Sequence, residues 1–158
     1  MTTLRTRIAQ VAVVLFAPAL ASCGFDAQTD QVYIPGRGVN DRSGEVDVLN
    51  VVVVSATDGS GTVVASLVNN GGDRDDTLTG VTVGGSEATI AKEGGDIPVN
   101  GINNLGESGA VSASSEEIEE GTFVEVAFTF ENAEAVTVDA PVVPHDAEYE
   151  DIPMKQAR

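Results

Sequence analysis

Hydrophobic and polar residues alternate in short runs along most of the chain. Residues 46–54 are dominated by valine, and the turn-forming pair Asp58-Gly59 separates them from a second apolar run at 62–69. Later, residues 124–130 place a large apolar side chain at every second position. Such runs, rich in β-branched residues and bounded by Gly, Asn and Asp, are typical of strands joined by tight turns. The pattern predicts strands at 46–54, 62–69, 78–83, 88–91, 111–113, 124–130 and 135–143.

The middle of the chain has little periodicity. Residues 94–109 include five glycines and three asparagines. The apolar residues among them predict two very short strands or loop positions that face the core; these residues are Ile97, Val99, Ile102 and Leu105. Residues 114–121 are compatible with one helical turn capped by serine or with an acidic loop, and the segment is too short for the sequence to decide.

Seven or eight short strands spaced by about ten residues predict a single antiparallel β-sandwich. We expect this domain to cover residues 45–143, after a glycine-containing linker at 23–44 and before an acidic, disordered tail at 144–158. A true immunoglobulin domain is disfavoured, because the chain has no tryptophan and only one cysteine. Within the linker, the apolar residues 32–34 could dock on the domain or remain an apolar patch of the linker.

The N-terminus has the pattern of a secretory signal. Arg5 and Arg7 precede an apolar run at 8–20, and small residues follow it. The run is shorter than the roughly 20 residues of a membrane-spanning helix, so a signal peptide over residues 1–22 is favoured over a transmembrane anchor.

The end of this segment is more specific. Leu20, Ala21 and Ser22 directly precede Cys23, the one cysteine of the chain. The sequence resembles the lipobox of bacterial lipoproteins. That resemblance implies cleavage before Cys23, a diacylglycerol thioether on the Cys23 sulfur and acylation of the new amino terminus. The alternative is an ordinary free thiol, which is unusual in an exported protein.

The chain is strongly acidic. Its formal net charge is −17, and residues 1–22 hold two of the eight basic residues but none of the 25 acidic ones. Nucleic acid is therefore disfavoured as a partner, since binding requires cations that displace phosphate counterions. Electrostatic adhesion to anionic lipids is disfavoured for the same reason, so the membrane contact is expected through the acyl chains. The simplest role of the acidity is solubility.

Candidate chemistry is sparse. After Cys23 the chain has one histidine, His145, and one methionine, Met154, which are weak candidate metal ligands in the tail. No Gly-x-Ser-x-Gly motif accompanies His145, and no group of residues has zinc-ligand spacing. The acidic loop at 73–76 could bind calcium, but Arg74 lies within it and a turn-capping role is favoured. We expect no enzymatic activity and no cofactor.

Residues 67–70 with 75–81, and residues 120–131 with 136–142, carry a resemblance to a known family, the PCu(A)C-type periplasmic copper chaperones. Residues 67–70, followed by 75–81, are similar to the family's strand, asparagine-bearing turn and Asp-x-Leu-x-Gly stretch. Residues 120–131 and 136–142 are similar to its closing hairpin. The resemblance implies a cupredoxin-like β-sandwich, in agreement with the predicted strands. The chain also resembles actinobacterial lipoproteins of unassigned role that share this sandwich.

The family's copper site does not carry over. The resemblance implies Cu(I) ligands of histidine and methionine between the Asp-x-Leu stretch and the closing hairpin, yet no His or Met occurs between Gly80 and Gly121. Carboxylates do not replace such soft ligands.

Three functions remain open from the sequence. We favour a membrane-anchored, non-catalytic binding or interaction module of the cell envelope, with an unidentified envelope protein as partner and no metal. The second is a copper-trafficking lipoprotein that uses His145 and Met154. The third is a carrier of a small ligand in a pocket of the sandwich.

Overall fold

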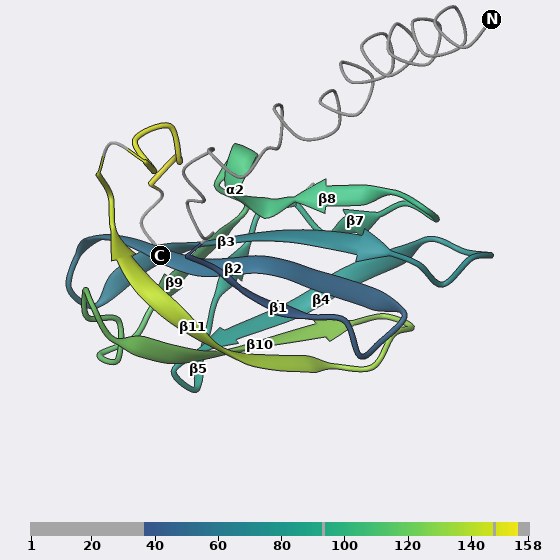
Figure 1. Cartoon of the computed structure of the whole chain (residues 1–158), viewed down its shortest axis with the longest axis horizontal. Helices are drawn as coiled ribbons and strands as arrows, with labels where there is room; N and C mark the ends of the chain where they lie inside the picture. Colours follow the sequence, from purple (N-terminus) through teal and green to yellow (C-terminus); the bar gives the residue numbers. More distant parts are fainter. Residues whose placement is uncertain (1–36, 93, 147, 155–158) are drawn as a thin grey trace, which may run out of the picture. The chain divides into compact units, whose positions relative to one another are not determined.

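The apolar runs at 46–54 and 62–69 form the central hairpin of a β-sandwich in the computed structural model, which describes residues 37–92, 94–146 and 148–154 (Figure 1). Within these residues eleven strands and one short helix occur. They are β1 (Val39–Asp41), β2 (Val46–Thr57), β3 (Ser60–Asn69), β4 (Asp76–Val83), β5 (Ser86–Glu87), β6 (Thr89–Ile90), β7 (Asp96–Ile97), β8 (Ile102–Asn104), α2 (Leu105–Ser108), β9 (Val111–Ser114), β10 (Phe123–Phe130) and β11 (Val136–Pro144). In the part of the chain that the structure describes, no helix is long and apolar enough to cross a membrane.

Strand β11 belongs to both layers of the sandwich. Its first part pairs antiparallel with β10, from Val136 opposite Phe128 to Pro141 opposite Phe123. Its last residues, from Val142 to Pro144, pair parallel with β2. The strand order is β5-β4-β10-β11-β2-β3-β9-β6, so β11 carries the chain from one layer to the other. The predicted β-sandwich is confirmed, with this parallel pair as its one departure from antiparallel pairing in the described sheet.

Alternation decides which side chains enter the core. In β10, Val124, Val126, Phe128 and Phe130 are buried, whereas the residues between them are exposed or half-buried. They pack between the layers against the inward-facing valines of β2 and β3. Burial of a large apolar side chain contributes about 1.5–3 kcal/mol, so this core is the main source of stability. The alternation predicted from the sequence is confirmed.

Glycine makes two of the predicted turns possible. Gly59 has φ of +80° in the turn between β2 and β3, and Gly84 has φ of +53° in the turn between β4 and β5. Residues with a Cβ atom rarely adopt these angles. Of the two alternatives for residues 114–121, the structure has the acidic loop, anchored by the fully buried Ile118. The one helix of the described residues lies elsewhere, at α2.

The C-terminal segment is packed on the sandwich, so the prediction of a disordered tail from residue 144 is wrong for residues 145–146 and 148–154. Tyr149, with 8% of its surface exposed, packs on the outward-facing Val52, Val54 and Val143. Two hydrogen bonds also hold the segment: the His145 amide donates to the Ser55 carbonyl (2.9 Å), and the Thr62 hydroxyl donates to the Pro153 carbonyl (3.2 Å). The outward valines of β2 need an apolar cover, and this segment supplies it.

The structured domain also begins earlier than residue 45. Strand β1 lies within the predicted linker and pairs antiparallel with β2, with Val39 opposite Val51. The apolar residues 32–34, the signal segment and Cys23 lie outside the described residues.

Candidate binding site

Three connections meet at one end of the sandwich: the β1–β2 loop, the β3–β4 loop and the β10–β11 turn. Strands β2, β4 and β11 begin there, and β3 and β10 end there, because β10 runs antiparallel to β4 and β11, β3 runs antiparallel to β2, and β11 runs parallel to β2. Between the loops lies an open cavity of about 400 Å³. It is lined by Ser43, Gly44, Glu45, Arg74, Asn132 and Glu134. We call it the three-loop cavity.

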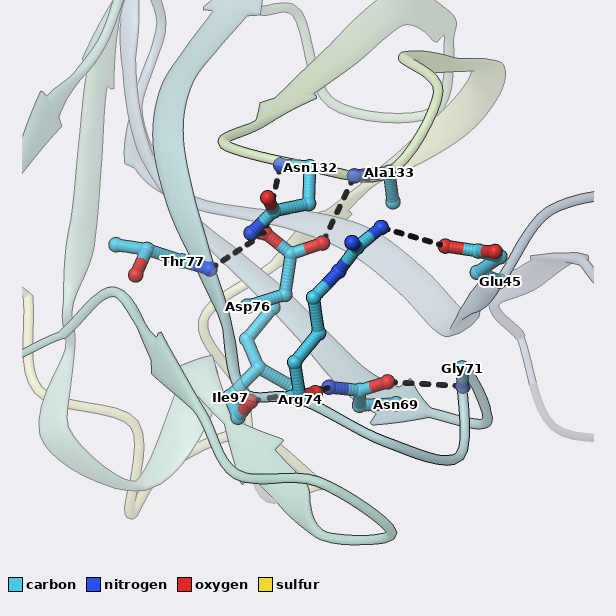
Figure 2. A network of polar contacts seen from close by, with 9 residues as sticks. All are labelled: Glu45, Asn69, Gly71, Arg74, Asp76, Thr77, Ile97, Asn132 and Ala133. Atoms are coloured by element: carbon cyan, nitrogen blue, oxygen red, sulfur yellow. Dashed lines mark hydrogen bonds and ion pairs between the residues drawn. The ribbon is translucent and has the colours of Figure 1, made fainter.

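Asp76 ties two of these loops together. One of its carboxylate oxygens, Oδ1, accepts hydrogen bonds from the Thr77 amide (2.7 Å) and the Asn132 amide (3.0 Å). The other oxygen, Oδ2, accepts one from the Ala133 amide (2.8 Å). Figure 2 shows these donors converging on the carboxylate, which is buried with 5% of the residue exposed. The β10–β11 turn is therefore fixed to the start of β4.

The hydrogen bonds keep Asp76 ionised. Burial alone raises the pKa of its carboxyl group, since a charged group is less stable away from water. The amides of Thr77, Asn132 and Ala133 stabilise the charged form, and together they outweigh burial and lower the pKa below its usual 3.8. Asp76 is thus a charged structural residue at neutral pH.

Asn69 orders the β3–β4 loop in the same region. Its side-chain amide donates to the Arg74 carbonyl (2.9 Å), and its Oδ1 accepts from the Gly71 amide (2.9 Å). The Asn70 amide then donates to the Glu45 carbonyl (2.8 Å), which joins this loop to the loop after β1. The backbone positions of Arg74 and Glu45 are therefore set by hydrogen bonds.

The aspartates of this loop act on the backbone, which confirms the turn-capping interpretation for two of them. Asp75 accepts a hydrogen bond from the Val99 amide (2.8 Å), while Asp76 holds the turn described above. Across the described residues, no three His, Cys, Asp or Glu side chains gather as a group that could hold a metal ion.

The charged side chains of the cavity remain accessible. The Arg74 side chain extends past Asp76 towards Glu45, with 3.8 Å between its Nη2 and Glu45 Oε2 (Figure 2). Both side chains are about 60% exposed. Glu134, on the β10–β11 turn, is exposed too and adds a second carboxylate to the lining. The cavity thus combines one guanidinium with two carboxylates.

The two weak candidate metal ligands lie in the C-terminal segment. His145 Nε2 is 3.1 Å from the carbonyl oxygen of Ile152, which precedes Met154 by two positions in the sequence. Met154 is half-buried and packs on the apolar cluster of Val52, Val54, Val143 and Tyr149. The two residues lie nine positions apart in the sequence, and neither lines the three-loop cavity.

Sequence reasoning missed the lining of the cavity. Glu45, Asn132 and Glu134 occur in ordinary turn sequences, and their proximity depends on which strands pair. Asp76 was the one indication of this region in the sequence, because it begins the Asp-x-Leu-x-Gly stretch. The pattern did not indicate that Asp76 binds the β10–β11 turn.

The fold is that of solved PCuAC domains. No protein-family model and no curated protein matches the chain. Among solved structures, "Copper-bound PCuAC domain from PmoF2" has 20% identity to this chain and a TM-score of 0.57, and the match covers 67% of this chain and 98% of the solved chain. "Apo PCuAC domain from PmoF1" has 22% identity and a TM-score of 0.57, with 67% and 99% covered. "Apo PmoF2 PCuAC domain" has 21% identity and a TM-score of 0.53, with 69% and 98% covered.

These likenesses show that the chain has the fold of a PCuAC domain. The agreement spans almost the full length of the solved domains. The predicted resemblance to the PCu(A)C fold is therefore confirmed at the level of the fold.

Proposed function

We propose that this protein is a lipid-anchored, extracytoplasmic binding module of the cell envelope, built on a PCuAC-type scaffold without that scaffold's Cu(I) ligands and without enzymatic activity. The observation that carries the proposal is the distribution of soft ligands. After Cys23 the chain has only His145 and Met154, and neither residue type occurs between Gly80 and Gly121. Thioether and imidazole groups select Cu(I), and the acidic side chains of this chain do not substitute for them.

The anchoring part of the proposal is supported by the N-terminal sequence. Arg5 and Arg7 precede an apolar run, and this run leads into the Leu20-Ala21-Ser22-Cys23 stretch. Two or more acyl chains on Cys23 give stable membrane attachment, whereas a single chain gives only marginal binding. The linker after Cys23 and the acidic domain then keep the binding surface in the aqueous phase.

The anchoring proposal is tested on the protein extracted from membranes of a bacterial host. We expect an intact mass that corresponds to a chain starting at Cys23 with a diacylglycerol thioether and an N-acyl group. The Cys23→Ser variant should appear in the soluble fraction or as an uncleaved precursor. An unmodified Cys23 in the wild-type protein would overturn this part of the proposal.

A second candidate is copper trafficking through the C-terminal segment. It is favoured by one contact, the approach of His145 Nε2 to the Ile152 carbonyl (3.1 Å), two residues before Met154. Its test is a Cu(I) competition titration that compares the wild type with a variant carrying both His145→Ala and Met154→Leu. A lower affinity in the variant supports this candidate, and an equal affinity rejects these two ligands.

A further inference from the structure

The three-loop cavity has no apolar side chain in its lining. Its six residues supply a hydroxyl, an amide, one guanidinium and two carboxylates. A volume of about 400 Å³ lies in the range of sites for small organic ligands. A ligand of this cavity is therefore small and polar, and its charges decide whether it fits.

The loops that carry these groups are ordered before any ligand binds. Asp76 holds the Asn132 and Ala133 amides, and Asn69 holds the β3–β4 loop through the Gly71 amide and the Arg74 carbonyl. Preorganised loops lose little conformational freedom on binding, which favours affinity for a small ligand.

Arg74 has the geometry to receive a carboxylate. Its distance of 3.8 Å to Glu45 is an ion-pair contact and exceeds a hydrogen-bond length, so Glu45 does not occupy its donors. The planar guanidinium fits a ligand carboxylate with two parallel hydrogen bonds. The chain is acidic overall, so this cation is the feature of the cavity that attracts an anionic group.

Glu45 and Glu134 favour cationic groups in the same ligand. The cavity side chains carry one positive and two negative charges, and the complementary ligand carries one carboxylate and two ammonium groups. A bare metal cation matches less well, because Arg74 repels it. A simple carboxylate matches less well, because both glutamates repel it.

We propose that the three-loop cavity binds a diamino monocarboxylic acid of the lysine type, with the carboxylate on Arg74 and the ammonium groups on Glu45 and Glu134. This assignment deepens the proposed role as a binding module and names its ligand class.

The first test is calorimetric titration of the full chain in a mild detergent with L-lysine. We expect a dissociation constant on the order of 0.1–1 mM for so small and polar a ligand. Two compounds each remove one feature: norleucine lacks the side-chain ammonium, and cadaverine lacks the carboxylate. Each should bind at least about tenfold more weakly, because each loses a charge-assisted hydrogen bond. Equal binding of all three compounds, or no binding of L-lysine, would overturn the proposal.

The second test assigns the contacts by substitution. The Arg74→Gln variant should lose the preference for L-lysine over cadaverine, and the Glu134→Gln variant should lose the preference for L-lysine over norleucine. Glu125→Gln is the matched control, because Glu125 is an exposed residue of β10 outside the lining. Unchanged preferences in the first two variants, or the same losses in Glu125→Gln, would overturn the assignment.

A parallel Cu(I) titration of the same protein separates this proposal from the proposed function. Tight Cu(I) binding together with lysine selectivity would contradict the metal-free role and leave the cavity assignment standing. If the protein shows neither tight Cu(I) binding nor selectivity for lysine, the cavity assignment is contradicted and the metal-free role is not.

Discussion

Replacing Asp76 with asparagine keeps the shape of the side chain but removes its charge and one of its acceptor oxygens. In the structure, three backbone amides donate to this buried carboxylate, from Thr77, Asn132 and Ala133. The side-chain oxygen of the asparagine can replace Oδ1. The side-chain NH₂ group then takes the place of Oδ2 and faces the Ala133 amide, so two hydrogen-bond donors oppose each other. The variant therefore loses one charge-assisted hydrogen bond and leaves a backbone donor without its partner.

We expect Asp76→Asn to lower the free energy of unfolding by about 2–4 kcal/mol, since hydrogen bonds to charged groups contribute about 1.5–3 kcal/mol and an unsatisfied buried donor adds to the loss. Urea unfolding followed by far-UV circular dichroism measures this change. Asp75→Asn is the matched control, because among the described residues Asp75 accepts one hydrogen bond, an exposed one from the Val99 amide. It should cost less than about 1 kcal/mol.

The loss should also depend on pH. The folded-state pKa of Asp76 lies below its usual 3.8, so the charge stabilises the fold at any pH above that value. As the pH falls from 3.8 through the lowered folded-state pKa, wild type and variant should converge in stability. An Asp76→Asn variant that is as stable as Asp75→Asn at pH 7 would refute the reasoning. A stability difference that stays constant from pH 7 down to the acid limit of folding would refute it too.

Three further results are expected. Tyr149→Ala should lower the free energy of unfolding by about 2 kcal/mol and increase binding of an apolar dye, because it uncovers the outward valines of β2. Burial, followed by the nearby charge of Glu148, raises the pKa of Tyr149 above 10.0 despite the opposing effect of Arg37. Tyrosinate absorbance should therefore show one late-titrating tyrosine, and the stability that the neutral phenol contributes should be complete below pH 10 and lost as the pH rises through the raised pKa. Gly84→Ala should lower the thermal stability more than Gly85→Ala, because a Cβ atom at Gly84 would lie 2.6 Å from Ser115 Oγ, whereas a Cβ atom at Gly85 would have no described heavy atom within 4 Å apart from its chain neighbours.

The strands were predictable because their signals are local. The alternation of Val124, Val126, Phe128 and Phe130 predicts a half-buried strand without any knowledge of its partners, and β10 follows it. The turns at Asp58-Gly59 and Gly84-Gly85 were equally readable, since positive φ angles favour glycine. Such features depend on a few neighbouring residues.

The packed C-terminal segment was missed although a signal for it was present. The four consecutive valines from 51 to 54 bury both faces of β2, and a strand with one solvent-exposed face would have alternated instead. The run therefore required an apolar cover outside the sandwich. Residues 144–158 are acidic and contain prolines, and this composition favoured the prediction of disorder. Tyr149 and Ile152, which supply the apolar cover, were therefore overlooked.

The candidate site was the least predictable part. Its residues lie far apart in the sequence, and Asp76 meets the Asn132 amide only because β4 pairs with β10. The register of that pair is set by packing of the core, so no local pattern around Glu45 or Glu134 reveals the cavity.

We propose that the PCuAC-type fold serves binding in this protein without Cu(I). The decisive experiment is native mass spectrometry of the full chain, released from a mild detergent and titrated with Cu(I), Cu(II), Zn²⁺ and Ca²⁺. We expect no stoichiometric Cu(I) adduct that survives a mild chelator, because the chain after Cys23 offers only His145 and Met154 as soft ligands. A one-to-one Cu(I) adduct that persists with the chelator, and that disappears when both residues are replaced, would contradict the claim and establish a copper site in the C-terminal segment.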